Sequence, residues 1–119
     1  MEIERRKEKR IKVEDLPENL KTISFSIGNF GEFPATTIDA SNSGMSFVAF
    51  GIFENDVSPG QELIIHIKDN NCGLKARLIY AEIEYVNEVG EDLLRFGVSF
   101  KNASSLKKYQ DILKDGKTD

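Results

Sequence analysis

Cysteine, histidine and tryptophan are nearly absent from the sequence, which excludes several classes of enzyme and secreted protein. Its 119 residues include one cysteine, one histidine and no tryptophan. A single cysteine cannot form an internal disulfide, which is typical of a reducing compartment, and we expect a cytoplasmic protein. One histidine and one cysteine are too few for a His/Cys metal site or for most acid–base catalytic sets. We therefore expect no metal, no cofactor and no enzymatic activity.

Long apolar stretches are also missing. No run of about eighteen apolar residues occurs, so we expect no membrane span. The N-terminus is charged from Glu2 onward and lacks the apolar segment of a secretory signal. The composition, 39% apolar and 30% charged, is that of a soluble globular protein, and the length fits one domain.

Positive charge is scarce except near the N-terminus. Residues 1–12 hold six basic and three acidic residues, whereas the whole chain has a net charge of −4. An acidic body lacks the broad basic surface that nucleic-acid phosphates demand, so we expect no nucleic-acid polymer as a partner. A short basic arm on such a body indicates either a small anionic partner or only a solvated terminus.

Apolar and polar residues alternate along much of the chain, which predicts a series of strands separated by turns. The predicted inward faces are Ile23, Phe25 and Ile27; Thr36, Ile38 and Ala40; Met45, Phe47 and Ala49; Leu63, Ile65 and Ile67; and Leu94, Phe96, Val98 and Phe100. Turns are expected at Gly28–Pro34, Asn42–Gly44, Pro59–Gly60, Asp69–Asn71 and Asn87–Glu91, where glycine, proline, asparagine and acidic residues gather.

The longest predicted strand, residues 74–86, changes face half-way. Its apolar residues are first Leu74, Ala76 and Leu78 and then Ile79, Ala81, Ile83 and Tyr85. A β-bulge at Leu78–Ile79 explains this change of parity, and bulges bend strands so that a sheet can close. The sequence therefore predicts a curved sheet.

A short helix is expected after the last strand. Ser104 or Ser105 would cap it, with Leu106, Tyr109 and Leu113 on one face, and it would end before Gly116. The fold class is thus all-β and mainly antiparallel: a six-stranded barrel with a flexible basic N-terminal arm and a short C-terminal helix. One domain would cover residues 1–119, divided into the arm (1–19), the barrel (20–101) and the helix with its tail (102–119).

Two arginines in the arm form the first candidate site. Arg6 and Arg10 are four residues apart, which keeps both side chains on one side whether the arm is helical or extended. The planar guanidinium binds phosphate through two hydrogen bonds and stacks on purine faces. By itself, the pattern is equally typical of a charged and poorly ordered terminus.

A second candidate site begins at Asp39. Asp39 and Ser41 share a strand face opposite Ile38 and Ala40, so both are expected to point outward. A carboxylate offers two acceptors for the N–H donors on the Watson–Crick edge of guanine, and a hydroxyl beside it donates or accepts. Gly44 would permit a positive φ or the close approach of a ligand. An ordinary hairpin turn, whose side chains cap their own backbone, would use the same residue types.

Together, the two segments resemble the PilZ domain family. The resemblance rests on R-x-x-x-R at Arg6 and Arg10, followed by D-x-S-x-x-G at Asp39, Ser41 and Gly44. It continues through Gly44–Phe47, Pro59–Leu63 and Arg95–Phe100, so that it covers nearly the whole chain. The resemblance implies a receptor for cyclic di-GMP, a bacterial second messenger. By position, Arg6 and Arg10 would bind phosphates and guanine, Asp39 and Ser41 a guanine edge, and Gly44 would shape the turn.

The positive charge and low apolar content of the arm predict a mobile segment and how a signal would be passed on. Arg5 precedes the motif and would add a phosphate or stacking contact. A dianionic ligand would draw the arginines inward, order the arm and present a new surface to an unidentified downstream protein. The alternative is a PilZ-like barrel that binds no nucleotide and serves as a protein-interaction module.

Overall fold

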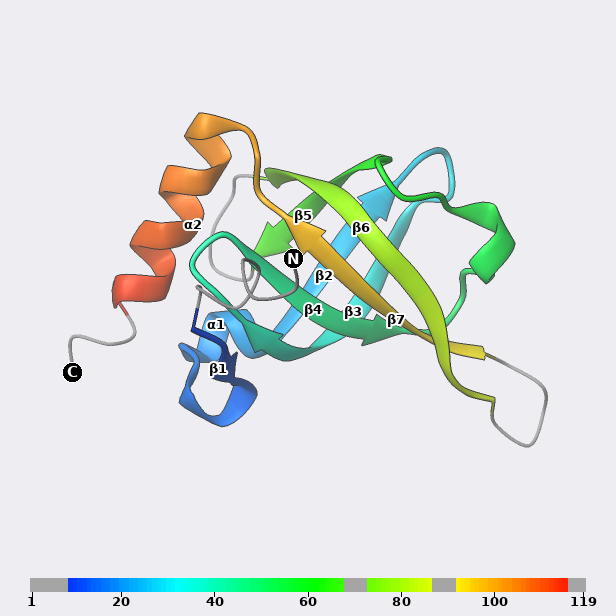
Figure 1. The fold of residues 1–119 in the computed structure, drawn as a ribbon, viewed down its shortest axis with the longest axis horizontal. Coiled ribbons are helices and arrows are strands. Elements are labelled where there is room, and N and C mark those ends of the chain that lie inside the picture. Colours follow the sequence, from blue (N-terminus) through cyan, green and yellow to red (C-terminus); the bar gives the residue numbers. More distant parts are fainter. Residues whose placement is uncertain (1–8, 68–72, 87–91, 116–119) are drawn as a thin grey trace, which may run out of the picture.

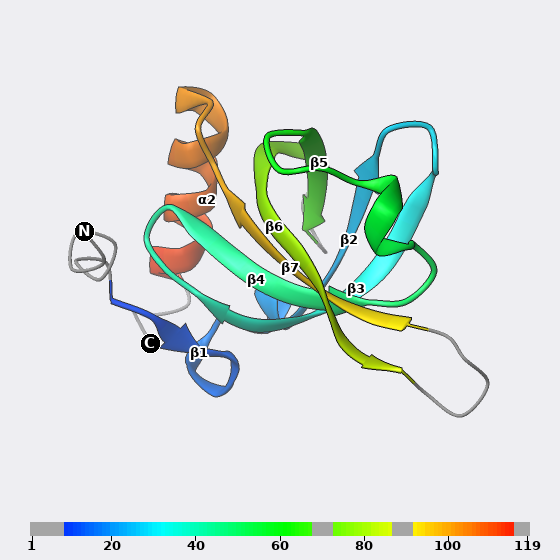
Figure 2. The same ribbon diagram turned by 45° about the vertical axis from the view of Figure 1, so that its right-hand side comes forward.

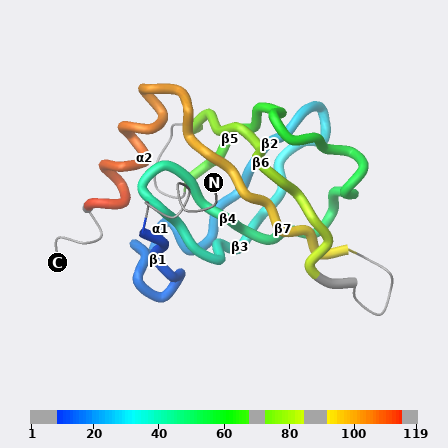
Figure 3. The backbone as a smooth tube through the Cα atoms, viewed as in Figure 1, coloured from blue at the N-terminus to red at the C-terminus, as the bar shows by residue number. Residues whose placement is uncertain are grey.

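Strands make up most of the structure, a computed structural model that describes residues 9–67, 73–86 and 92–115. Figures 1 and 3 trace the chain through these elements. In chain order they are β1 (Ile11–Lys12), the 3-10 helix η2 (Val13–Asp15), α1 (Glu18–Lys21), β2 (Thr22–Ile27), β3 (Glu32–Ala40), β4 (Gly44–Ala49), the 3-10 helix η3 (Glu54–Asp56), β5 (Glu62–Ile67), β6 (Gly73–Val86), β7 (Asp92–Ser99) and α2 (Ala103–Asp115).

The sheet closes on itself into a barrel of six strands (Figures 1 and 2). Neighbouring strands follow the order β3–β2–β5–β6–β7–β4, and β4 pairs again with β3. These pairings are all antiparallel. The predicted six-stranded antiparallel barrel with a C-terminal helix is therefore confirmed.

The short strand β1 lies outside this ring, beside the end of β3. Ile11 pairs with Ala40 and Lys12 with Asp39. On its other edge, Asp39 pairs with Ser46 of β4. Both β2 and β1 pair with the same edge of β3. The pairing with β2 covers Glu32 to Thr36, and the pairing with β1 covers the last two residues of β3. The described end of the arm is thus paired with the barrel and not free of it.

The core is built around three phenylalanine rings from separate strands. Phe25, Phe47 and Phe96 are fully buried. The ring centroids lie 5.1 Å apart for Phe25 and Phe47, 5.1 Å for Phe25 and Phe96, and 5.3 Å for Phe47 and Phe96. Such pairs add to the stability already gained by burying large apolar side chains. The predicted inward positions of β2, β4, β5 and β7 are confirmed.

The helix α2 packs against one end of the barrel (Figure 1). Tyr109 and Leu113 are buried, as predicted. The helix begins earlier than predicted, since the side chain of Asn102 accepts a hydrogen bond of 3.0 Å from the backbone N–H of Ser105. The Ser105 hydroxyl instead accepts from the backbone N–H of Lys75 at 2.9 Å and so ties α2 to β6. No helix in the described ranges is long and apolar enough to cross a membrane.

The strand β6 confirms the predicted bulge but not the predicted second apolar face. Its register against β7 shifts between Leu78 and Tyr80, and again at Ile83. Ile79 and Ile83 are 54% and 45% exposed. The reason is that β5 ends its pairing at Arg77, so the rest of β6 has only β7 beside it. The two strands project beyond the barrel as a ribbon, at the lower right of Figure 1.

The strand β3 also departs from simple alternation. Ala35 and Thr37 are buried instead of Thr36 and Ile38, and the register against β4 shifts between Thr37 and Asp39. The hydroxyl of Thr37 tolerates burial because it donates a 2.5 Å hydrogen bond to the carbonyl oxygen of Leu20.

The preceding turn is shorter than predicted, because β3 already begins at Glu32. Pro34 pairs with Ser24 of β2, whereas β4 pairs with β3 only from Thr36 onward. Proline has no N–H to donate, and it is tolerated here because one edge of the strand is unpaired.

The phenylalanine cluster provides a test of the core. Replacing Phe96 with alanine should lower the free energy of unfolding by about 3–5 kcal/mol, because a large buried ring is removed and a cavity remains. Urea denaturation measures the change. The Phe53→Ala variant is the control, since Phe53 is 63% exposed, and it should change stability by about 0.5 kcal/mol or less. Equal losses in the two variants would contradict the described core.

Candidate functional site

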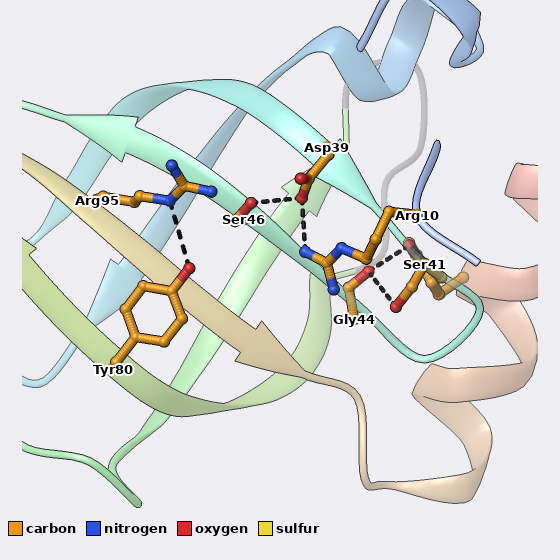
Figure 4. Close-up of polar contacts among 8 residues, drawn as sticks. Arg10, Asp39, Ser41, Gly44, Ser46, Tyr80 and Arg95 are labelled. Atoms are coloured by element: carbon orange, nitrogen blue, oxygen red, sulfur yellow. Dashed lines mark hydrogen bonds and ion pairs between the residues drawn. The ribbon is translucent and has the colours of Figure 1, made fainter. Parts of the chain in front are cut away.

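The carboxylate of Asp39 lies at the centre of a polar cluster on the outer barrel face (Figure 4). Its side chain is 22% exposed. One oxygen, Oδ1, accepts a 2.6 Å hydrogen bond from Nη2 of Arg10 and another of 2.6 Å from the hydroxyl of Ser46. The contact with Arg10 is also an ion pair. The cluster therefore joins the arm, β3 and β4 at one atom.

Backbone pairing explains why Arg10 reaches Asp39. Lys12 is paired with Asp39 and Ile11 with Ala40, and Arg10 directly precedes these two arm residues. The structure brings Arg10 of the arm and Asp39 of the second motif together, although they are 29 residues apart in the sequence. Arg5 and Arg6 lie outside the described residues.

Ser41 does not point outward as predicted. It is 3% exposed, and its hydroxyl faces the carbonyl oxygen of Gly44 at 3.5 Å. Its backbone N–H donates to the same carbonyl at 2.8 Å. The strand β3 ends at Ala40, so the alternation that places Asp39 on the outer face no longer holds one residue into the turn.

Gly44 is required by the close approach of two strands. A Cβ atom at this position would lie 2.4 Å from the carbonyl oxygen of Val98 in β7. Its backbone is not among those with a positive φ in the described residues. The sequence indicated either a positive φ or the close approach of a ligand at Gly44. The structure shows a close approach, and the group that approaches is the backbone of β7.

The helix α2 holds the turn that follows Asp39. The buried hydroxyl of Tyr109 lies 2.6 Å from the carbonyl oxygen of Ser41 and 2.8 Å from that of Gly44. The side-chain amide of Gln110 donates to the carbonyl oxygen of Asn42 at 3.0 Å. These contacts were not predictable from the sequence, which indicated only that the apolar face of the helix would bury Tyr109.

A cavity of about 660 Å³ opens beside Arg10. It is lined by Lys9, Arg10, Ile11, Lys12, Asp15, Asn42 and Leu113. Three of these residues are cationic and one is anionic, so the cavity favours an anion. Its volume falls in the range typical of small-molecule sites.

Ser46, Tyr80 and Arg95 also lie on the outer face, and none of them was predicted to be a site residue. Ser46 pairs with Asp39 on one side and with Gly97 on the other, and Gly97 pairs with Tyr80. Nε of Arg95 lies 3.4 Å from the Tyr80 hydroxyl (Figure 4). This hydrogen bond, together with the nearby charges of Asp39 and Glu84, raises the pKa of Arg95.

Fold and site define a small antiparallel barrel domain with a cation-lined cavity at one edge. The family model for the PilZ domain matches residues 4–114, and the chain belongs to the PilZ domain family. A search of curated proteins gave no match. Among solved structures, the chain is similar to the PilZ domain with c-di-GMP of YcgR from Escherichia coli. The TM-score is 0.66 at 15% identity, over 95% of this chain and 92% of that one, a likeness that confirms the fold.

No group of three or more histidine, cysteine or acidic side chains in the described residues could hold a metal ion.

The Gly44 contact gives a direct test of the turn. Gly44→Ala should lower the free energy of unfolding by about 1–3 kcal/mol, because the added methyl group forces β4 and β7 apart. Thermal or urea denaturation measures the loss. Asn42→Ala is the neighbouring control, since the Asn42 side chain is exposed and its hydrogen bond with Gln110 of α2 uses the backbone carbonyl. An unchanged midpoint for Gly44→Ala would contradict the described packing.

Proposed function

We propose that this protein is a receptor for cyclic di-GMP. The observation that carries the proposal is the meeting of Arg10 and Asp39 on the outer barrel face, beside a cavity lined with cations. Membership of the PilZ domain family and the fold shared with a PilZ domain described with c-di-GMP support it. The role is one of binding, without catalysis or cofactor, in the cytoplasm.

The chemistry of the two residues suits a guanine nucleotide. The Asp39 carboxylate matches the two N–H donors of guanine, and the Arg10 guanidinium matches a phosphate. In the structure the two groups form an ion pair with each other, and the side chain of Arg10 in this pair is 53% exposed. Solvent weakens such pairs, so a ligand replaces this contact at little cost. Ser46 would keep the carboxylate oriented during the exchange.

The remaining motif residues take supporting roles in this proposal. Arg6 and Arg5 would add cations from the arm, and Gly44 would hold the turn against β7. Ser41 contributes to the shape of the turn through its contact with Gly44. For direct contact with guanine, the turn would have to open and the Ser41 side chain would have to rotate.

Ligand binding would be signalled to a partner protein. The ligand would fix the arm against the barrel and complete a surface for a downstream protein. The second candidate, an interaction module without nucleotide binding, is favoured by exposed aromatic side chains away from the site. These are Phe30, Phe50 and Phe53, which are 48%, 41% and 63% exposed.

Calorimetric titration with cyclic di-GMP tests the receptor function. The wild-type protein should bind, and Arg10→Ala and Asp39→Ala should each weaken binding about 10- to 150-fold, because each removes a charged hydrogen-bonding group. Lys107→Ala is the matched control: it breaks an exposed ion pair with Asp111, within α2, and should bind as the wild type does. Thermal midpoints without ligand check that each variant folds.

Two results would count against the receptor function. One is the absence of wild-type binding at millimolar ligand in low salt, which would leave the interaction module. The other is unchanged affinity in both site variants, which would move the ligand to another surface.

Amide hydrogen exchange tests the ordering of the arm. Saturating cyclic di-GMP should slow exchange in residues 2–12 relative to the ligand-free protein, because new contacts hold the arm against the barrel. Exchange in the core strands β2 and β7 serves as the internal reference. Equal exchange in residues 2–12 with and without ligand would refute the switch while leaving the binding function intact.

A further inference from the structure

A tyrosine ring covers a glycine next to the site. Tyr80 of β6 is paired with Gly97 of β7. A Cβ atom on Gly97 would lie 2.2 Å from Cε2 of Tyr80 and 2.6 Å from its Cζ. The ring therefore occupies the space above Gly97 that any other residue would fill. It extends from its own strand across β7 toward β4.

This position brings the ring up to the Asp39 cluster. Gly97 is paired with Ser46, and Ser46 with Asp39, so these residues form one row across three strands. Adjacent strands are about 4.8 Å apart, which places Gly97 about 10 Å from Asp39 along the row. A molecule held by Asp39 and somewhat larger than one base would therefore reach the ring.

The ring is also held in place from one side. Arg95 lies on the same outer face as Gly97, two residues before it, and its Nε is 3.4 Å from the Tyr80 hydroxyl. Both side chains are half-buried, so each keeps part of its surface open to solvent. Figure 4 shows Tyr80 and Arg95 beside the Arg10–Asp39–Ser46 contacts.

We propose that Tyr80 and Arg95 extend the Asp39 site, with the Tyr80 ring as a stacking surface for a purine base and Arg95 as a contact for phosphate or the base edge. The proposal rests on the proposed function, which supplies a ligand with two bases and two phosphates. Aromatic rings bind bases by stacking, and arginine binds both phosphates and purine edges. Tyr80 and Arg95 would thus distinguish a dinucleotide from a single nucleotide.

An aromatic ring that covers a glycine also stabilises the sheet. If this were the only role of Tyr80, replacing it would lower the stability of the protein and leave ligand binding unchanged. The experiment must therefore separate the two. Tyr80→Leu keeps an apolar cover over Gly97 but removes the ring. Tyr80→Phe keeps the ring and loses the hydroxyl. Ile79→Ala is the control, since Ile79 is the adjacent, 54% exposed residue of the same strand.

Calorimetry with cyclic di-GMP compares these variants with the wild type. Tyr80→Leu should bind about 5- to 150-fold more weakly, as expected for loss of one stacked base. Tyr80→Phe should recover most of that loss, Arg95→Gln should bind several-fold more weakly, and Ile79→Ala should match the wild type. Wild-type affinity in Tyr80→Leu would overturn this inference alone. No binding by the wild type would overturn the proposed function and this inference with it.

A second measurement remains informative if Tyr80→Leu does not fold. Nuclear magnetic resonance of protein labelled at its three tyrosines resolves the Tyr80 ring, which Tyr80→Phe identifies by the loss of its signals. Saturating cyclic di-GMP should shift these ring signals through the ring current of a stacked purine. Unchanged Tyr80 signals in a saturated wild-type sample would refute the stacking role.

Discussion

The pairing of the end of β3 on both of its edges is the constraint on which the site depends. Asp39 has Lys12 of β1 on one side and Ser46 of β4 on the other. The first pairing brings the arm's Arg10 to the carboxylate, and the second closes the barrel and provides the Ser46 hydroxyl. Barrel closure and site assembly are therefore consequences of the same few backbone hydrogen bonds.

The fold was largely predictable, because a strand with one face against the core has apolar residues at every second position. Phe25, Phe47 and Phe96 follow that pattern and are buried as predicted. Prediction failed where a strand's neighbours change along its length. Ile79 carries the pattern of a core residue yet is exposed, because only one strand lies beside that part of β6.

The two segments that form the candidate site were predictable, because each contains a motif with recognisable spacing. The two motifs were recognisable in the sequence, and the backbone pairing of β1 with β3 is what brings Arg10 to Asp39. The burial of Ser41 was not predictable, because it depends on where β3 ends and on the Tyr109 hydroxyl, a contact 68 residues away. The position of Tyr80 was not predictable either, because only its pairing with Gly97 of another strand places it near Asp39.

The cation-lined cavity has walls from opposite ends of the described chain, Lys9 beside β1 and Leu113 in α2. A fluorophore or a second protein fused near either end would therefore start close to the same bound molecule. If the proposed ligand occupied this cavity and drew the arm inward, energy transfer between two such labels would report its binding without any alteration of the barrel.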